Sequence, residues 1–127
     1  ILEDGSFRAI REIWNDIDVA ILSVSQIDEH TSMYRSGVFD AADLSSFIQA
    51  GGVCATNFTV LDADGRETDV PIAERVVNLP FHRLREIPHV IVVAAGEQKT
   101  EALRAVLASG VVNRLITDAD CGGALAV

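Results

Sequence analysis

Hydrophobic positions follow two patterns along the chain. Segments in which they recur at helical spacing predict helices, and short continuous apolar runs predict strands. Between residues 6 and 14 the apolar side chains recur at helical spacing, so we expect an amphipathic helix with Ser6 as its N-cap. Residues 18–24 form a short, mainly apolar run, which predicts a strand buried on both faces. The first quarter of the chain therefore favours an α/β protein with a parallel sheet.

The middle of the chain changes pattern at its polar and glycine-containing segments. Residues 26–37 are mainly polar and predict a long connecting loop, where binding residues are common. Asp40 is a candidate N-cap for a helix that ends at Gly51-Gly52, and a strand is expected over 53–61. The Asp-Gly turn within 61–66 predicts an antiparallel hairpin arm that returns through 68–70.

The last third of the chain has the order strand, turn, helix, strand. A short amphipathic helix over 81–86 should end before Pro88, and the apolar run 89–95 predicts a central strand broken by Gly96. A helix over about 98–108 and a strand over 114–117 complete a right-handed βαβ unit. Together the patterns predict an α/β fold: a doubly wound, mostly parallel sheet with a β-hairpin arm.

Composition and charge limit what this domain can bind. The 127 residues are 49% hydrophobic and 23% charged, which suits one domain with a single core. A formal net charge of −9 argues against a direct grip on DNA or on an anionic membrane surface. No apolar run approaches the ~20 residues of a membrane-spanning helix, so we expect a cytoplasmic protein.

The cysteines and aspartates do not form a metal-binding pattern. Cys54 and Cys121 lack CxxC spacing, and we interpret them as reduced thiols, although a disulfide between them stays open. The aspartates of the turn at 61–66 lack the further oxygen ligands and closing Glu of a calcium loop, so that turn is expected to be solvated. We expect neither a metal nor a cofactor.

The segment 94–99 carries the clearest candidate chemistry. A turn after a parallel strand places backbone N–H groups and the positive end of a helix at the carboxyl edge of the sheet, where anions and ligands bind. The candidate ligand-binding residues are therefore Gly96, Glu97, Gln98 and Lys99, with Arg35 in the polar loop as a second cation for a phosphate. The competing interpretation is that Gly96 only permits the turn and that both cations are solvated.

Catalytic patterns are missing from the sequence. Each of His30, His82 and His89 has an ordinary structural interpretation, and no Ser/His/Asp order, HExxH, GxSxG or GxGxxG occurs. We therefore expect no catalytic residue and no enzyme.

Several segments taken together resemble one protein family. The residues Leu84-Arg85-Glu86-Ile87-Pro88, the apolar strand over 89–95, Gly96-Glu97-Gln98-Lys99 with Ala102-Leu103, and Thr117-Asp118 are similar to the closing block of SorC-family sugar-binding domains. Upstream, Gly37-Val38-Phe39, Gly51-Gly52-Val53 and the turn over 61–65 are similar to that family in order and spacing. The resemblance covers nearly the whole chain.

The resemblance implies a sensor of phosphorylated sugars. Such domains are related in fold to ribose-5-phosphate isomerase and glucosamine-6-phosphate deaminase, and they follow an N-terminal helix-turn-helix. Residues 1–127 would be the C-terminal part of the effector domain, without the DNA-binding helix-turn-helix and without the Gly/Thr-rich phosphate loop that the family has early in the domain. By the resemblance, Lys99 and Arg35 contact the effector phosphate. Ala95 and Ala55 depart from the family pattern, where Gly and a nearby acidic residue are usual.

Three functions remain open at this point. The first is the effector module of a homo-oligomeric transcriptional regulator, which meets DNA only through a separate domain and shifts between states when a sugar phosphate binds. The second is an isomerase or deaminase, which would need a general base near the substrate carbon. The third is a module kept for oligomer contacts, whose exposed strand edge would promote self-association.

Overall fold

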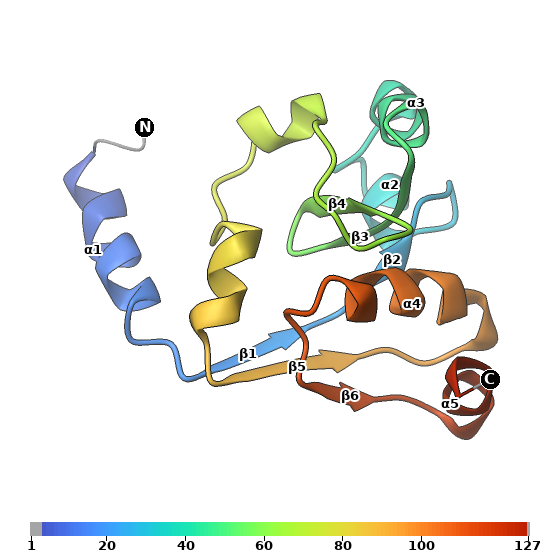
Figure 1. Ribbon diagram of the computed structural model, residues 1–127. Coiled ribbons are helices and arrows are strands. Elements are labelled where there is room, and N and C mark those ends of the chain that lie inside the picture. Colours follow the sequence, from blue (N-terminus) through green and yellow to red (C-terminus); the bar gives the residue numbers. More distant parts are fainter. Residues whose placement is uncertain (1–3, 127) are drawn as a thin grey trace.

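A computed structural model describes residues 4–126, which form two small sheets with helices packed around them (Figure 1). The elements follow the chain in this order: α1 Gly5–Trp14, β1 Val19–Leu22, β2 Ser25–Gln26, α2 Ser32–Arg35, α3 Ala41–Gln49, β3 Gly52–Thr56, β4 Thr59–Asp62, the 3-10 helices η1 Pro71–Glu74 and η2 Phe81–Glu86, β5 His89–Val93, the 3-10 helix η3 Glu97–Lys99, α4 Thr100–Ala108, β6 Arg114–Ile116 and α5 Ala119–Leu125.

The first sheet is parallel and has the strand order β1-β5-β6. Val19 lies opposite His89, and Ile91 lies opposite Arg114. The predicted βαβ unit is confirmed, because α4 connects the neighbouring parallel strands β5 and β6. The three carboxyl ends therefore meet at one edge, which is the edge that the sequence marked as the candidate binding region.

Only one face of this sheet is covered within the described residues. Side chains on the covered face, such as Val90 and Val92, are fully buried under α4 and η2, whereas Ile21 and Ile116 on the opposite face are 69% and 57% exposed. In Figure 1 no helix of residues 4–126 lies across that opposite face. The α/β prediction is thus confirmed, but the prediction that 18–24 is buried on both faces is wrong, because helices of residues 4–126 cover one face of the sheet only.

The second sheet is antiparallel with the order β2-β3-β4. The single strand expected over 53–61 is wrong, because the chain reverses at Asn57 and Phe58, which have φ of 48° and 56°. Two successive residues in the left-handed region make the two-residue turn that matches strand twist, and Asn tolerates that conformation well. The Asn57 amide also donates to the Leu79 carbonyl at 2.8 Å, which anchors the turn to the chain before η2.

The predicted Asp-Gly turn is present, but the segment that follows it pairs with β4 over fewer residues than expected. Gly65 has φ of 77°, and the chain after it pairs with β4 only through an isolated bridge between Leu61 and Glu67. The Thr68 N–H donates to the Val60 carbonyl at 2.9 Å, after which the ladder ends. The hairpin arm is therefore built mainly from β3 and β4.

Helix capping agrees with the sequence at one helix and differs at another. Asp40 caps α3 as expected and forms a capping box with Asp43, whose carboxylate also bonds Arg75. For α1 the predicted cap is wrong: the Asp4 side chain accepts from the Ser6 N–H at 2.9 Å, so the N-cap lies two residues earlier than predicted. An Asp is an equally good cap, and it lies outside the apolar periodicity on which the prediction was based.

Two clusters of buried side chains hold the fold together. The larger fills the space between the parallel sheet, α4 and η2, and its members include Val90, Val92, Leu84, Leu103 and Val106. The smaller surrounds Phe39 and Phe47, whose rings meet edge to face at 5.1 Å between centroids. Cys54 and Cys121 are both buried and unpaired, in agreement with the interpretation as reduced thiols.

Candidate functional site

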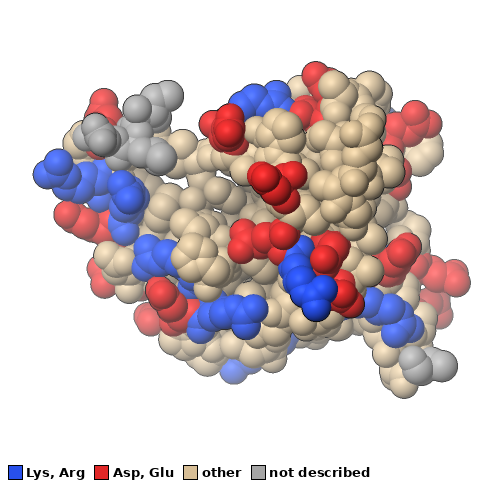
Figure 2. Space-filling model, turned by 45° about the horizontal axis from the view of Figure 1, so that its top comes forward, with Lys and Arg blue, Asp and Glu red and all other residues tan. Residues whose placement is uncertain are grey.

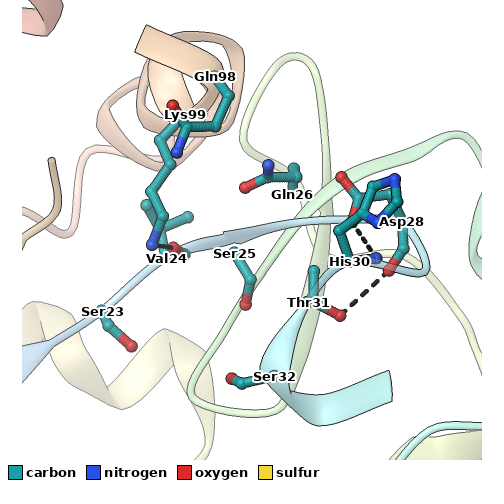
Figure 3. Close-up of a pocket in the computed structure, with 10 residues that line it drawn as sticks. All are labelled: Ser23, Val24, Ser25, Gln26, Asp28, His30, Thr31, Ser32, Gln98 and Lys99. Atoms are coloured by element: carbon teal, nitrogen blue, oxygen red, sulfur yellow. Dashed lines mark hydrogen bonds between the residues drawn. The ribbon is translucent and has the colours of Figure 1, made fainter. Parts of the chain in front are cut away.

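A hollow of about 630 Å³ lies beyond the carboxyl ends of the parallel strands, beside the antiparallel sheet. Figure 3 shows its walls, which come from the β1–β2 connection, the polar loop and the start of the α4 region. This is the edge where open α/β sheets bind ligands. The lining residues are Ser23, Val24, Ser25, Gln26, Asp28, His30, Thr31, Ser32, Gln98 and Lys99.

The floor of the hollow is fixed by the crossing from β1 to β2. Val24 is 1% exposed and sits in the larger core, so the flanking hydroxyls of Ser23 and Ser25 face the other way. The Thr56 hydroxyl donates to the Ser23 carbonyl at 2.7 Å, which ties the crossing to β3. The backbone at this edge is thus held in place from two sheets.

Lys99 is the one cation among the lining residues. Its ammonium donates to the Val24 carbonyl at 3.0 Å, so the side chain reaches from the helix to the end of β1 (Figure 3). The ion pairs of the described residues join Arg66 to Asp64, Arg75 to Asp43 and Arg83 to Glu86, and none of them uses Lys99. A lysine has three donors, so one bond to a neutral carbonyl leaves its charge and two protons for an anion.

Gly96 shapes the turn that carries Lys99, but it does not line the hollow. Its φ is 105°, and an added Cβ would meet the Gln98 side chain at 2.6 Å. Its N–H donates to Asp118 at 2.5 Å, so this amide already has a partner in the structure, and a contact from Gly96 to a ligand stays a prediction. The bond from the Cys121 N–H, together with this one from Gly96, lowers the pKa of the Asp118 carboxyl.

The structure brings together only part of the predicted set. Gln98 and Lys99 line the hollow, Glu97 lies exposed on the outer side of the turn, and Gly96 acts through the backbone. Arg35 is exposed at the end of α2 and is not among the residues that line the hollow, although α2 begins at the rim. A contact from Arg35 to a ligand stays a prediction.

The polar loop supplies residues that were not identified individually from the sequence. Residues 26–37 were expected to be a loop, yet they include the end of β2 and the short helix α2, which Thr31 caps. Asp28, His30, Thr31 and Ser32 all line the hollow. In the sequence, the one feature that pointed to these residues is their place in the polar segment after the first predicted strand, where binding residues are common.

The hollow is suited to bind a small polar anion. It combines an ammonium, a carboxylate, an imidazole, two amides and four hydroxyls, which is the mixture of donors and acceptors that a polyhydroxylated ligand requires. Within residues 4–126, no three His, Cys, Asp or Glu side chains gather closely enough to hold a metal ion.

Figure 2 shows basic and acidic side chains interspersed over much of one face, with the main group of basic side chains at the α1 end. With a net charge of −9, an anion is attracted only where a cation is placed for it, and Lys99 is such a cation. None of the helices in the described part is both long and apolar enough to cross a bilayer.

Comparison with known proteins identifies the family. Residues 1–125 match the family model described as "Putative sugar-binding domain". The transcriptional regulator LsrR of Klebsiella pneumoniae is 28% identical over 118 residues, which cover 91% of this chain and 36% of that regulator. This chain thus spans about a third of the length of that curated relative.

Solved structures confirm the fold. A DeoR family transcriptional regulator from Listeria monocytogenes matches with a TM-score of 0.92 and 27% identity, over 98% of this chain and 50% of that one. The full-length sorbitol operon regulator SorC from Klebsiella pneumoniae matches with a TM-score of 0.85 and 19% identity, over 98% of this chain and 40% of that one. The chain belongs to the family of sugar-binding domains found in SorC-type transcriptional regulators.

Proposed function

We propose that the hollow binds a phosphorylated sugar and that Lys99 holds the phosphate. The supporting observation is the position of the ammonium: its bond to the Val24 carbonyl holds it at the carboxyl edge of the parallel sheet, and no carboxylate of residues 4–126 forms an ion pair with it. The first turn of α4 adds the positive end of a helix dipole in the same region. The surrounding hydroxyl and amide groups then bond the sugar.

Binding of the sugar phosphate would control the longer protein. In this proposal the chain is the effector domain of a cytoplasmic, homo-oligomeric regulator that binds DNA through a separate N-terminal helix-turn-helix. An effector shifts the regulator between states only through its differential affinity for them. Two bonds of the turn before α4, from Lys99 to Val24 and from Gly96 to Asp118, join this turn to the β1–β2 connection and to the N-cap of α5, which links the site to other elements.

Thermal melting of the chain with a panel of compounds tests the site. The panel pairs phosphorylated with unphosphorylated sugars, because a ligand that binds only the folded state raises stability by RT ln(1 + [L]/Kd). Phosphorylated members should raise the melting temperature, and Lys99→Gln, which keeps the stem but removes the charge, should lose that shift. The proposal fails if the phosphorylated compounds give no shift, or if Lys99→Gln responds as the wild type does.

Arg35 is the proposed second cation, because it lies on the short helix α2, whose first residue, Ser32, lines the hollow. In the same melting experiment Arg35→Ala should reduce the shift with phosphorylated sugars only. An unchanged shift assigns the phosphate to Lys99 alone.

We propose a sensor rather than an enzyme, since the relatives are named as transcriptional regulators. A relationship of the fold to sugar-phosphate isomerases stays a prediction, and a turnover assay with ribose 5-phosphate and glucosamine 6-phosphate addresses it. Asp28 and His30 are the acid-base groups of the hollow. Product above background that disappears in Asp28→Asn would contradict the sensor proposal.

A further inference from the structure

The hollow carries opposite charges on two sides. Lys99 lies on one side, and Figure 3 shows the Asp28 carboxylate across the hollow from it, with Gln26 and Ser25 between them. The two are not an ion pair, since the ion pairs of the described residues include neither of them. A ligand that spans the hollow therefore contacts the Lys99 ammonium at one end and the Asp28 carboxylate at the other.

The Asp28 side chain is held in a fixed orientation by its own loop. Its Oδ1 accepts from the His30 N–H at 2.8 Å, and its backbone carbonyl accepts from the Thr31 hydroxyl at 3.1 Å. Among residues 4–126, no donor bonds the other carboxylate oxygen, Oδ2. A half-buried carboxylate oxygen that is fixed in place without a protein partner is an acceptor available to a ligand.

We propose that Asp28 determines ligand specificity, so that the hollow takes a sugar monophosphate with free hydroxyls at the end remote from the phosphate and rejects a bisphosphate. This inference rests on the proposed function, in which Lys99 holds the phosphate. An ionised carboxylate only accepts hydrogen bonds, so it favours a hydroxyl, which can donate. A second phosphate at that end would meet a like charge and would have no donor from Asp28.

Asp28→Asn is a matched test because it changes the charge and keeps the turn. An Asn side-chain oxygen can still accept from the His30 N–H, as in the Asx turns that both residues form. The variant should therefore melt like the wild type without ligand. What it loses is the negative charge and the acceptor strength of a carboxylate at Oδ2.

The experiment measures dissociation constants for the chain with inorganic phosphate, glucose 6-phosphate, ribose 5-phosphate, glucosamine 6-phosphate and fructose 1,6-bisphosphate. For the sugar monophosphates we expect Asp28→Asn to weaken binding by roughly ten-fold or more, as for loss of a hydrogen bond to a charged group. Inorganic phosphate should bind both proteins alike. The bisphosphate should bind the wild type more weakly than the monophosphates do, and Asp28→Asn should narrow that difference.

The outcomes separate this inference from the proposed function. If Lys99→Gln weakens all phosphorylated compounds while Asp28→Asn leaves the monophosphates and the mono-to-bisphosphate ratio unchanged, only the role of Asp28 is overturned. If glucosamine 6-phosphate alone is sensitive to Asp28→Asn, the residue selects an ammonium and the proposal for hydroxyls is wrong. If no compound of this set binds the wild type at millimolar concentration, both proposals fall.

Discussion

Truncating two neighbouring valines of β5 tests whether the parallel sheet is covered on one face only. Val92 is 0% exposed and lies in the larger core, whereas Val93 is 43% exposed. Val93 lies on the opposite face of the parallel sheet, which no helix of residues 4–126 covers and which we call the bare face. The two residues are adjacent in one strand and undergo the same substitution, and the cost of such a substitution in a strand depends on what packs against each face. Any difference between them therefore measures what lies against each face.

The expected sizes follow from burial. Removing two buried carbon groups of Val92 costs about 1.6 kcal/mol at about 0.8 kcal/mol each, and the cavity left in a close-packed core brings the loss to about 2–3 kcal/mol. Val93 loses roughly half of that transfer free energy and leaves no cavity, so about 1 kcal/mol or less is expected. The difference between the variants should be about 1.5 kcal/mol.

Urea unfolding followed by circular dichroism measures this difference. With a slope of about 2 kcal/mol/M, 1.5 kcal/mol separates the two midpoints by about 0.8 M. The measurement is repeated at two protein concentrations, because a second copy on the bare face would make the Val93→Ala loss depend on concentration. Equal losses in the two variants would refute the one-sided sheet.

Three further predictions concern other regions. Burial raises the pKa of the Cys54 thiol to about 12, so the native chain at pH 8 should leave it unlabelled by a thiol reagent that reacts readily once the chain is unfolded. Gly65→Ala should lower the melting temperature, since its Cβ would lie 2.2 Å from the Ser109 nitrogen at a φ of 77°; an unchanged melt would contradict that packing. Backbone N–H donors, first that of Cys121 and then that of Gly96, lower the pKa of the Asp118 carboxyl. The stability that the ionised carboxylate contributes is therefore present above the ordinary pKa of an Asp and is lost as the pH falls through the lowered pKa. Asp118→Asn should therefore lose less stability than the wild type between pH 6 and pH 3 in urea unfolding.

The order of the parallel strands β1, β5 and β6 and of the helix α4 was predictable, because each strand is a short apolar run set off by polar residues, glycine or proline. The βαβ unit at the C-terminal end followed from the apolar run 89–95 and its break at Gly96, which has positive φ in the structure. The reversal at Asn57 and Phe58 was not predictable, because Phe rarely adopts positive φ and the run around it is continuously β-prone. The bare face was missed because a run of valine and isoleucine has the same pattern whether or not a partner covers it.

The site was predictable only where backbone topology fixes it. A turn between a parallel strand and a helix must lie at the carboxyl edge, and this placed Gln98 and Lys99 at the hollow. The position of Asp28 across from Lys99 depends on how the antiparallel sheet and α2 pack beside that edge, which involves contacts far apart in the sequence. The occupied N–H of Gly96 depends likewise on Asp118, 22 residues later.

The most direct test of the central claim combines the Lys99 charge with the ligand phosphate. Calorimetric titration gives dissociation constants for a sugar and its phosphorylated form, each with the wild type and with Lys99→Gln. Because the two charges should interact with each other, we predict that the phosphate strengthens binding to the wild type and that most of this gain is absent in Lys99→Gln. An equal gain from the phosphate in both proteins would show that Lys99 does not hold it, and would contradict the assignment of the hollow as the phosphate site.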